Sequence, residues 1–358
     1  MLDISSGNSP VSPIAGAPAL ADKVRFLGRG DSYAPFVETV LARETHMSWV
    51  FKAGERVYKL KKPVRFPFLD FSTLPRRETA CRAEFSLNRR LAPDVYLAVV
   101  PLTMARGALA IGGDGTVVDW LVVMRRLDEA KTLETAMIGH GLTPLWADRI
   151  AARLGRFYRH TRTVPIRPEA LLRNWRQALA YNRRVLIDPR LGLPRGGVEH
   201  TAHVLSQFLA ARSSLLAGRA RSRLIIDAHG DLRPEHIFLD DGVTIIDCLE
   251  FDARLRALDP LDEIAFLAME CERLGAAWAG ARIRRRLAQL LREDTDEALF
   301  LFYHGYRAML RARLSITHLL DPVPRTPEKW PRLARAYLDI AARDARRLER
   351  LLRRRGGR

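Results

Sequence analysis

Cysteine is scarce in this sequence, and its hydrophobic runs are short. Three cysteines, Cys81, Cys248 and Cys271, lie far apart among the 358 residues, which excludes a dense disulfide framework and predicts a reducing compartment. No apolar run reaches the roughly 18 residues that a membrane span requires. The first residues, MLDISS, lack the basic and apolar regions of a secretory signal. These absences predict a cytoplasmic protein with no membrane partner.

Lysine is also scarce, although the chain is strongly basic. Lys and Arg total 59 against 41 Asp and Glu, which gives a net charge of +18, yet only seven of the 59 are lysines. The arginines are spread along the whole chain, and the one dense basic run, residues 346–355, suits the C-terminal end of a solvated helix. This distribution favours whole-chain composition over a nucleic-acid-binding stripe. Nucleic-acid binding through the basic surface is kept as an alternative function.

The segment at residues 229–240, HGDLRPEHIFLD, carries the clearest chemical signal. It is similar to the catalytic loop of protein kinases, H-R-D-L-K-P-E-N, whose aspartate accepts the proton of the attacking hydroxyl and whose asparagine, five residues later, binds a metal ion. Asp231 matches the aspartate, and His236 stands where the pattern has asparagine. A hairpin turn at residues 240–242 and a second apolar strand lead to Asp247, where kinase-like enzymes place a magnesium ligand.

Together with this loop, five other segments resemble the aminoglycoside phosphotransferase-like branch of the protein-kinase-like fold, and within it a group of uncharacterised bacterial proteins. They are ETHMSWVF at 44–51, VYKLKKP at 57–63, LDFSTL at 69–74, LNRRLAP at 87–93 and DCLEFD at 247–252. The resemblance implies an α+β, bilobal protein-kinase-like fold with a small antiparallel-sheet N-lobe and a mainly helical C-lobe. It also implies an ATP-dependent phosphotransferase that acts on a hydroxyl group of a small-molecule acceptor. The implied cofactors are ATP and Mg²⁺, with Mn²⁺ as the alternative metal.

Hydrophobic periodicity and turn residues divide the chain into three parts. Residues 1–22 are predicted to be a disordered tail, residues 23–127 an N-lobe with the nucleotide-binding sheet and helix, and residues 128–358 a helical C-lobe with the catalytic loop and acceptor pocket. The expected strands are 36–40, 49–51, 57–60, 95–102 and 117–127, and a helix is expected near 76–92.

Lysines concentrate where the resemblance places the nucleotide-binding strand. Three of the seven lie within residues 59–62, and Lys59 and Lys61 are two residues apart, so they face the same side of a strand. By the family pattern, Lys59 is expected to bind the nucleotide phosphates, with Lys61 as the alternative. Glu84 is preferred to Glu78 as the helical carboxylate that holds this lysine.

The resemblance also assigns supporting positions. Ser48 ends a loop without glycines between the first two strands and is expected to help cover the phosphates. Met124 is expected near the adenine. His229 is expected to support the catalytic loop, and Asp262 to cap a helix and brace the same loop.

Four residues are assigned to the chemistry itself. Asp231 is the expected base or hydroxyl orienter, and Arg233 is expected to neutralise charge on the transferring phosphate. Asp247 is the expected metal ligand, and His236 the second one. Asparagine offers the hard oxygen that Mg²⁺ prefers, whereas an imidazole suits Mn²⁺ better. His236 therefore has three interpretations: a metal ligand, a hydrogen-bonding residue beside an unused metal position, or a sign of lost activity.

Two sets of charged residues could meet the acceptor. Basic and polar residues on one side of the helix near 298–320 could bind an anionic acceptor or form a solvated face; they are His304, Arg307, Arg311 and Ser315. Acidic residues within 293–297 could receive a polycation, but an acidic helix start is preferred for them. A nucleotide-binding pseudokinase with a regulatory role is the second functional alternative, and His236 is the feature that favours it. No partner protein is inferred.

Overall fold

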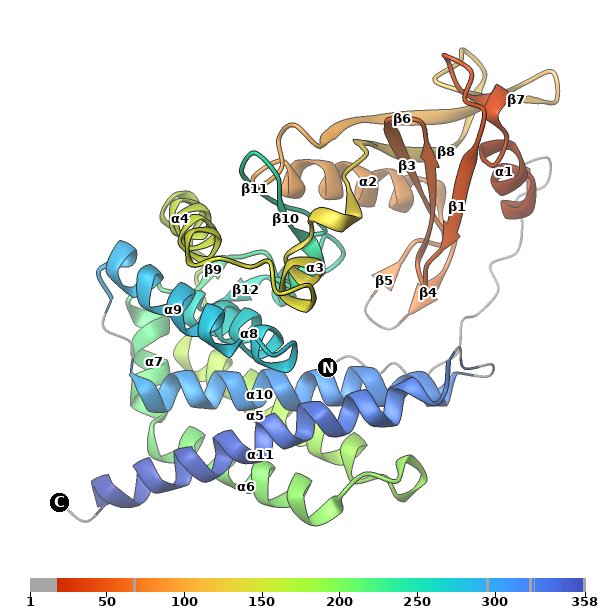
Figure 1. The fold of residues 1–358 in the computed structure, drawn as a ribbon. Coiled ribbons are helices and arrows are strands. Elements are labelled where there is room, and N and C mark those ends of the chain that lie inside the picture. Colours follow the sequence, from red (N-terminus) through yellow and green to blue (C-terminus); the bar gives the residue numbers. More distant parts are fainter. Residues whose placement is uncertain (1–17, 67–68, 294–295, 322–323, 325, 357–358) are drawn as a thin grey trace. The chain divides into compact units, whose positions relative to one another are not determined.

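The computed structural model describes residues 18–66, 69–293, 296–321, 324 and 326–356 (Figure 1). Its internal contacts divide the chain into two compact units. Among the described residues, the sheet unit contains those from 18 to 129 together with Thr244–Ala253, and the helical unit contains Ala130–Val243 and those from Arg254 onward. The segment Thr244–Ala253 thus groups with the sheet, whereas the sequence had placed it in the helical part.

The sheet unit begins with a helix inside the predicted tail. Residues 1–17 of that tail lie outside the described residues, but helix α1 spans Leu20–Leu27, so the prediction is wrong for its last residues. The helix forms because Lys23 anchors it. The Lys23 side chain is only 8% exposed, and its Nζ donates to Asp119 Oδ2 at 2.7 Å and to the Val118 carbonyl at 2.8 Å.

Six antiparallel strands form the sheet, in the order β1-β2-β3-β8-β6-β7. They are β1 (Val40–Glu44), β2 (Ser48–Ala53), β3 (Arg56–Lys61), β6 (Tyr96–Ala105), β7 (Ala108–Ile111) and β8 (Thr116–Arg125). The first strand starts at Val40 and not at residue 36, and β7 was not predicted. A separate pair joins β4 (Arg65–Phe66) to β5 (Leu69–Asp70).

Helix α2 (Leu74–Asn88) packs against β6 and β8, and the two faces of the sheet bury different residues. One face buries Phe51, Leu60 and Leu121 beside α1. The other buries Cys81 of α2 against Tyr96 and other apolar side chains. As a result, a polar residue of α2 that faces the sheet is removed from water and needs partners there.

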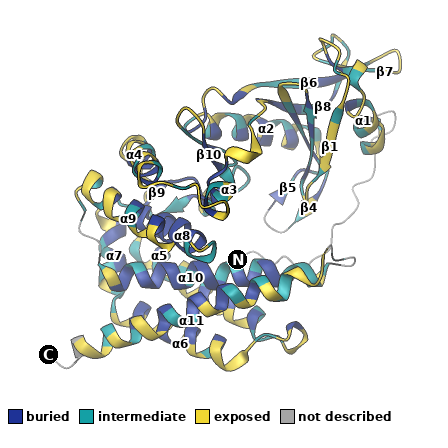
Figure 2. Ribbon diagram, in the orientation of Figure 1, coloured by how far each residue is buried: buried dark blue, intermediate teal, exposed yellow. Residues whose placement is uncertain are grey.

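The helical unit is built from helices of different lengths, most of which have one buried and one exposed side (Figure 2). They are α3 (Leu133–Ile138), α4 (Pro144–His160), α5 (Pro168–Leu186), α6 (Arg195–Ala211), α7 (Ser213–Arg221), α8 (Pro260–Arg273), α9 (Ala277–Leu291), α10 (Glu297–Ile316) and α11 (Lys329–Gly356). Helices α4 and α5 have Pro144 and Pro168 in the first turn, where proline removes no helical hydrogen bond. Helix α8 is enclosed by its neighbours, and every residue from Pro260 to Cys271 is buried.

Short strands and 3₁₀ turns connect these helices. The strands are β9 (Ile226–Asp227), paired with β12 (Ala257–Leu258), and β10 (Ile237–Leu239), paired with β11 (Val243–Ile245). The 3₁₀ turns found in the described residues of both units are η1 (Gly30–Ser32), η2 (Glu129–Lys131), η3 (Pro189–Leu191), η4 (Pro234–His236), η5 (Ala253–Leu255) and η6 (Thr317–Leu320). The predicted hairpin around residues 240–242 is confirmed, and the Gly242 carbonyl accepts from the Asp240 N–H at 3.1 Å.

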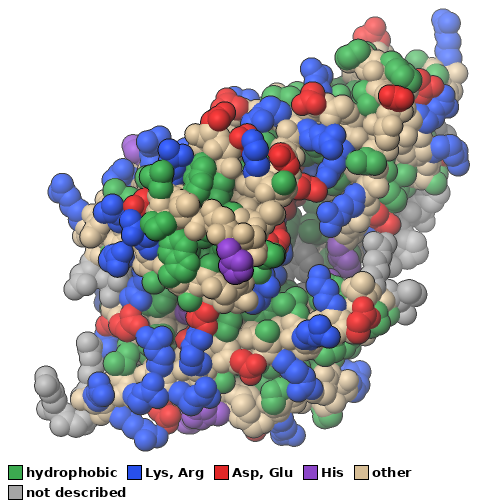
Figure 3. All heavy atoms as spheres, viewed as in Figure 1, with side chains coloured by type: hydrophobic (Ala, Val, Ile, Leu, Met, Phe, Trp, Pro, Cys, Tyr) green, Lys and Arg blue, Asp and Glu red, His purple; other side chains and the backbone are tan. Residues whose placement is uncertain are grey.

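The surface does not separate charges of opposite sign on the face that Figure 3 displays. Lys and Arg side chains are spread over it, with Asp and Glu side chains among them (Figure 3). Among the described residues, no helix combines the length and the apolar character that crossing a membrane would take.

Candidate active site

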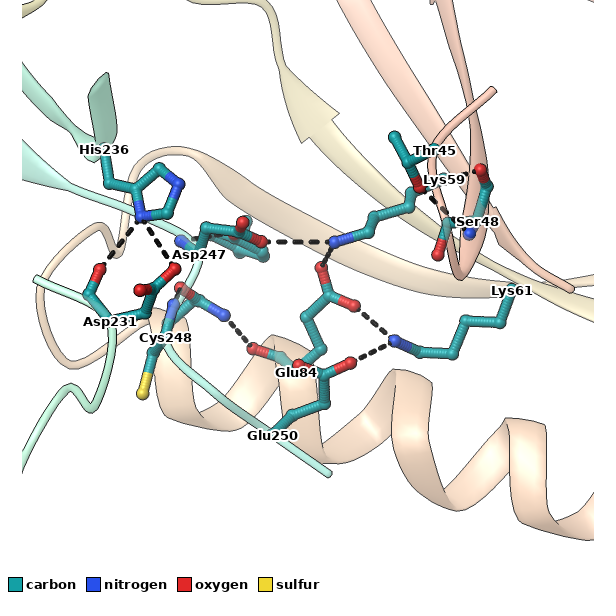
Figure 4. A network of polar contacts seen from close by, with 12 residues as sticks. Thr45, Ser48, Lys59, Lys61, Glu84, Asp231, His236, Asp247, Cys248 and Glu250 are labelled. Atoms are coloured by element: carbon teal, nitrogen blue, oxygen red, sulfur yellow. Dashed lines mark hydrogen bonds and ion pairs between the residues drawn. The ribbon is translucent and has the colours of Figure 1, made fainter. Parts of the chain in front are cut away.

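Lys59 lies on β3 and faces α2, as the strand period predicts. Its Nζ donates to Glu84 Oε1 at 2.8 Å and to Asp247 Oδ1 at 3.2 Å (Figure 4). Burial alone would lower the pKa of Lys59, but the carboxylates of Asp247, Glu84 and Glu250 raise it well above its usual value. The lysine is therefore held as a cation, and its side chain is still 17% exposed.

Lys61 faces the same side of β3 but is enclosed. Its side chain is 1% exposed, and its Nζ donates to Glu84 Oε2 and Glu250 Oε1, each at 2.6 Å (Figure 4). The ammonium also lies 4.9 Å from the centre of the Phe71 ring. Because both lysines share Glu84, the preference for Glu84 over Glu78 agrees with the observed contacts. Glu78 instead pairs with Arg82 on the outside of α2.

Glu250 is a site residue that the sequence reasoning missed. It lies three residues after Asp247, and its side chain is 11% exposed. A buried lysine beside an already paired carboxylate needs a second anion, but the sequence does not show that Lys61 is buried. The sequence also does not show that Glu250 lies against Lys61 of β3.

Asp247 occupies an unusual backbone conformation. Its φ is +63°, in the left-handed region that aspartate tolerates better than most residues. Its N–H donates to the Tyr96 hydroxyl at 3.3 Å, and the next N–H, of Cys248, donates to Asn88 Oδ1 at 2.8 Å. These two bonds fix the turn, so the Asp247 carboxylate is directed to Lys59 while its side chain stays 47% exposed.

Mg²⁺ is the metal that the resemblance implies, and the residues of the sheet unit fit it. Among the described residues no three His, Cys, Asp or Glu side chains converge as a metal cage. Mg²⁺ in nucleotide sites is held by one or two carboxylates together with phosphate oxygens, so a complete cage is not required. Asp247 meets this requirement, because its carboxylate is accessible and offers hard oxygen ligands.

The catalytic-loop segment is anchored by α8 within the helical unit. His229 is fully buried, and Glu263 of α8 accepts from the N–H groups of His229 at 3.3 Å and Gly230 at 2.6 Å. The Tyr158 hydroxyl donates to the same carboxylate at 2.9 Å. Burial raises the pKa of Glu263, although these hydrogen bonds oppose the change. The supporting role predicted for His229 agrees with this arrangement, since its Nδ1 accepts the N–H of Asp231 at 3.3 Å.

Asp262 does not have the predicted role. The cap of α8 is Asp259, whose Oδ1 accepts the Leu261 N–H at 2.9 Å. Asp262 is instead paired through both oxygens with Arg307 of α10, at 2.7 and 2.6 Å. The brace of the loop is therefore Glu263, one residue further on.

Asp231, Arg233 and His236 lie in one short stretch of the helical unit. The Asp231 side chain is 24% exposed, and its Oδ2 lies 3.7 Å from both Arg233 Nη1 and His236 Nδ1. Arg233 donates through Nη2 to Glu235, so it is paired with a neighbouring carboxylate. His236 Nδ1 lies 3.0 Å from the Asp231 carbonyl oxygen (Figure 4). A carbonyl can only accept, so Nδ1 carries a proton.

The remaining nucleotide assignments fall in the sheet unit. Ser48 is the first residue of β2, pairs with Lys61 and is 2% exposed, and its carbonyl accepts the Thr45 hydroxyl at 2.9 Å (Figure 4). Met124 is near the end of β8, is 9% exposed and packs in the cluster that contains Tyr96. Their contacts with a nucleotide stay predictions.

Of the two alternatives for the basic side of α10, an anion-binding site and a solvated face, the solvated face is wrong. His304 and Arg307 are buried, and His304 Nδ1 lies 2.6 Å from Asp344 Oδ2 of α11. Since α8 and α11 cover this side of α10, its basic residues are used in buried ion pairs. Arg311 also forms an ion pair, with Glu270, but 15% of its side chain stays exposed.

Sequence comparison finds relatives of this chain in two mycobacteria. No family model matches the chain. Uncharacterized proteins of Mycobacterium tuberculosis strain H37Rv and of Mycobacterium bovis are each 37% identical to it over 297 residues, which is 81% of this chain and 57% of the relative. The chain therefore spans only a little over half the length of these relatives.

Solved structures of small-molecule kinases match most of the chain. The choline kinase LicA from Streptococcus pneumoniae matches with a TM-score of 0.52 at 12% identity, over 89% of this chain and 97% of that one. The chain described here therefore has the protein-kinase-like fold. An ethanolamine kinase from Plasmodium vivax matches with a TM-score of 0.50 at 11% identity, over 87% and 84%. LicA in complex with AMP gives 0.50 at 12% identity, over 86% and 93%. The predicted α+β fold class is confirmed, and the chemistry rests on the residues described above.

Proposed function

We propose that this protein is an ATP-dependent phosphotransferase that transfers the γ-phosphoryl group to a hydroxyl of a small molecule. The observation that carries the proposal is Lys59 Nζ held between Glu84 and Asp247, at 2.8 and 3.2 Å. A β3 lysine paired with a helical glutamate, next to a metal-binding aspartate, is the arrangement with which protein kinases bind the nucleotide phosphates and the metal. The AMP bound by LicA, a protein of the same fold, supports the use of an adenine nucleotide.

Each side chain then has a definite task. Lys59 would bind the nucleotide phosphates while Glu84 keeps it in place, and Asp247 would hold Mg²⁺. When bound, the ion neutralises charge on the phosphate oxygens. Asp231 would orient the acceptor hydroxyl and accept its proton as the new O–P bond forms. Arg233 would stabilise negative charge on the transferring group, after exchanging Glu235 for a phosphate oxygen.

A pseudokinase is the second candidate, and His236 is the observation that favours it. Its Nδ1–H donates to the Asp231 carbonyl, so the residue braces the loop. A metal-binding histidine commonly donates its other ring N–H to a carbonyl in this way, which leaves Nε2 for the metal. The same geometry is therefore compatible with an active enzyme that uses His236 in place of asparagine.

Transfer of ³²P from [γ-³²P]ATP to a pool of small hydroxyl compounds tests the proposal. The wild type should label at least one acceptor. Asp231→Asn should lower kcat by roughly 10²–10⁴-fold while the binding of ATP is unchanged, because the side chain acts on the hydroxyl. Asp240→Asn is the matched control, since Asp240 pairs with Lys131 on the surface and has no assigned role. ATP binding without transfer in every pool would favour the pseudokinase.

A further inference from the structure

One buried carboxylate of the helical unit faces two arginines. Glu270 of α8 is 1% exposed; its Oε2 accepts Arg273 Nε at 2.7 Å and its Oε1 accepts Arg311 Nε at 3.0 Å. The Tyr337 hydroxyl of α11 donates to Oε1 at 2.8 Å. Two positive charges thus share a single close negative charge, which leaves local positive charge in excess.

Both guanidinium groups keep unused donors. In the described part of the chain, Arg311 donates hydrogen bonds to other side chains through Nε alone, at Glu270 and, at 3.4 Å, the Tyr337 hydroxyl, while its guanidinium carbon lies 5.6 Å from the centre of the Tyr337 ring. The nearest acid to Arg273 Nη2 among the described residues is Glu134, whose Oε1 lies 4.0 Å away and whose side chain is 36% exposed. The arginine side chains are 15% and 19% exposed, so their Nη groups can be reached from solvent. Arg307, one turn earlier on α10, differs because Asp262 engages both its Nε and its Nη2.

These arginines lie beside the catalytic-loop segment. Glu263, which holds the backbone of residues 229–230, precedes Glu270 by two turns on the same face of α8. Arg273 reaches toward Glu134 of α3, and α3 packs against η4, which contains His236. Burial lowers the pKa of Arg311, whereas Glu270, Tyr337 and the Asp231 carboxylate of that segment raise it.

Acidic residues that could bind a polycation are occupied elsewhere. Asp296 caps α10 and pairs with Arg212 at 2.6 Å, and Glu293 pairs with Arg219. Glu297 pairs with Arg284 at 2.7 Å and with Arg347 at 3.2 Å. Asp294 lies outside the described residues. The acidic helix start is thus confirmed for Asp296.

We propose that Arg311 and Arg273 form an acceptor subsite for a carboxylate or phosphate group, so that the substrate is an anionic hydroxy compound such as a hydroxy acid or a sugar phosphate. The inference rests on the proposed phosphotransferase function. A guanidinium presents paired N–H donors that match a carboxylate or phosphate, and the free Nη groups supply them. The acceptor anion would displace Glu134 from its long contact with Arg273, while its hydroxyl lies at Asp231.

Four acceptors of similar size test the charge preference directly: glycerate, glycerol 3-phosphate, glycerol and the cationic serinol. Charge-assisted hydrogen bonds predict a kcat/KM about 10- to 100-fold higher for one or both anions than for glycerol, with serinol lowest. Comparison of the two anions distinguishes a carboxylate from a phosphate subsite. Equal values for all four acceptors, or a preference for serinol, would overturn the inference.

Arg311→Lys and Arg273→Lys keep a cation beside Glu270 but remove the paired donors. They should raise KM for the preferred anion about tenfold while KM for ATP and KM for glycerol stay unchanged, a pattern that general loss of structure would not give. Arg282→Lys, at a surface pair with Asp148, is the matched control. If no acceptor is phosphorylated, calorimetric titration of the wild type and Arg311→Lys with glycerate and inorganic phosphate decides. If the wild type and Arg311→Lys bind these anions equally, or if neither binds them, the proposed subsite is overturned. Failure of the wild type to bind ATP would instead overturn the proposed phosphotransferase function.

Discussion

Replacing Lys61 by methionine should destabilise the sheet unit by about 3–5 kcal/mol. The Lys61 side chain is 1% exposed and donates to Glu84 and Glu250 at 2.6 Å each. Glu84 would keep Lys59, but Glu250, 11% exposed, would lose its cation. Removing one partner of a buried ion pair leaves an uncompensated charge, and this desolvated charge sets the magnitude.

Urea unfolding of four proteins measures the effect: wild type, Lys61→Met, Glu250→Gln and the double variant. The double variant should be more stable than the sum of the single changes predicts, because it removes both charges together. Lys62→Met is the matched control, since Lys62 pairs with Glu44 in a more exposed position and should cost at most about 1 kcal/mol. A cost below about 1 kcal/mol for Lys61→Met, or strict additivity, would refute the reasoning.

Three further results are expected. His236→Ala should lower turnover about equally in Mg²⁺ and Mn²⁺, because the ring braces Asp231; a Mn²⁺ advantage in the wild type that disappears in His236→Asn would show metal ligation instead. Burial raises the pKa of Cys81 and of Cys271 to about 12, so iodoacetamide at pH 8 should leave both unmodified in the folded protein and alkylate them in urea, as mass spectrometry would detect. Burial raises the pKa of Glu84, but Lys59 and Lys61 lower it by more, so the pKa lies below its usual value. Its contribution to stability is therefore present above the unfolded pKa, about 4.3, and is lost as the pH falls through the folded pKa. Glu84→Gln should flatten the dependence of the urea midpoint on pH between 7 and 3.

Local patterns in the sequence predicted much of the sheet unit, because its signals are local. Alternation places Lys59 and Lys61 on one face of β3, and the hairpin signal places a turn before Asp247. The same alternation cannot separate the two lysines, since it gives both the same direction. Their difference in exposure, 17% against 1%, arises from the packing of α2 and Glu250 onto that face.

The helical unit was harder to predict because a helix pattern does not identify what covers its second face. His304, Arg307 and Arg311 share one side of α10, and a polar side usually indicates solvent. Here α8 and α11 lie against it, and their acids, among them Glu270 and Asp344, pair with the arginines and the histidine. Charges brought together from sequence positions so far apart carry no local signal, so the ion pairs could not be foreseen.

Thermal unfolding with MgATP tests the central claim most directly. Binding raises stability by RT ln(1 + [L]/Kd), about 2.7 kcal/mol when the nucleotide is at one hundred times its Kd. The wild type and Lys62→Met should both show a rise in Tm with MgATP, and Lys59→Met should show little or none, because it removes the cation held between Glu84 and Asp247. No rise in the wild-type Tm at millimolar ATP with Mg²⁺ or Mn²⁺, or an equal rise in Lys59→Met, would contradict the proposed nucleotide site.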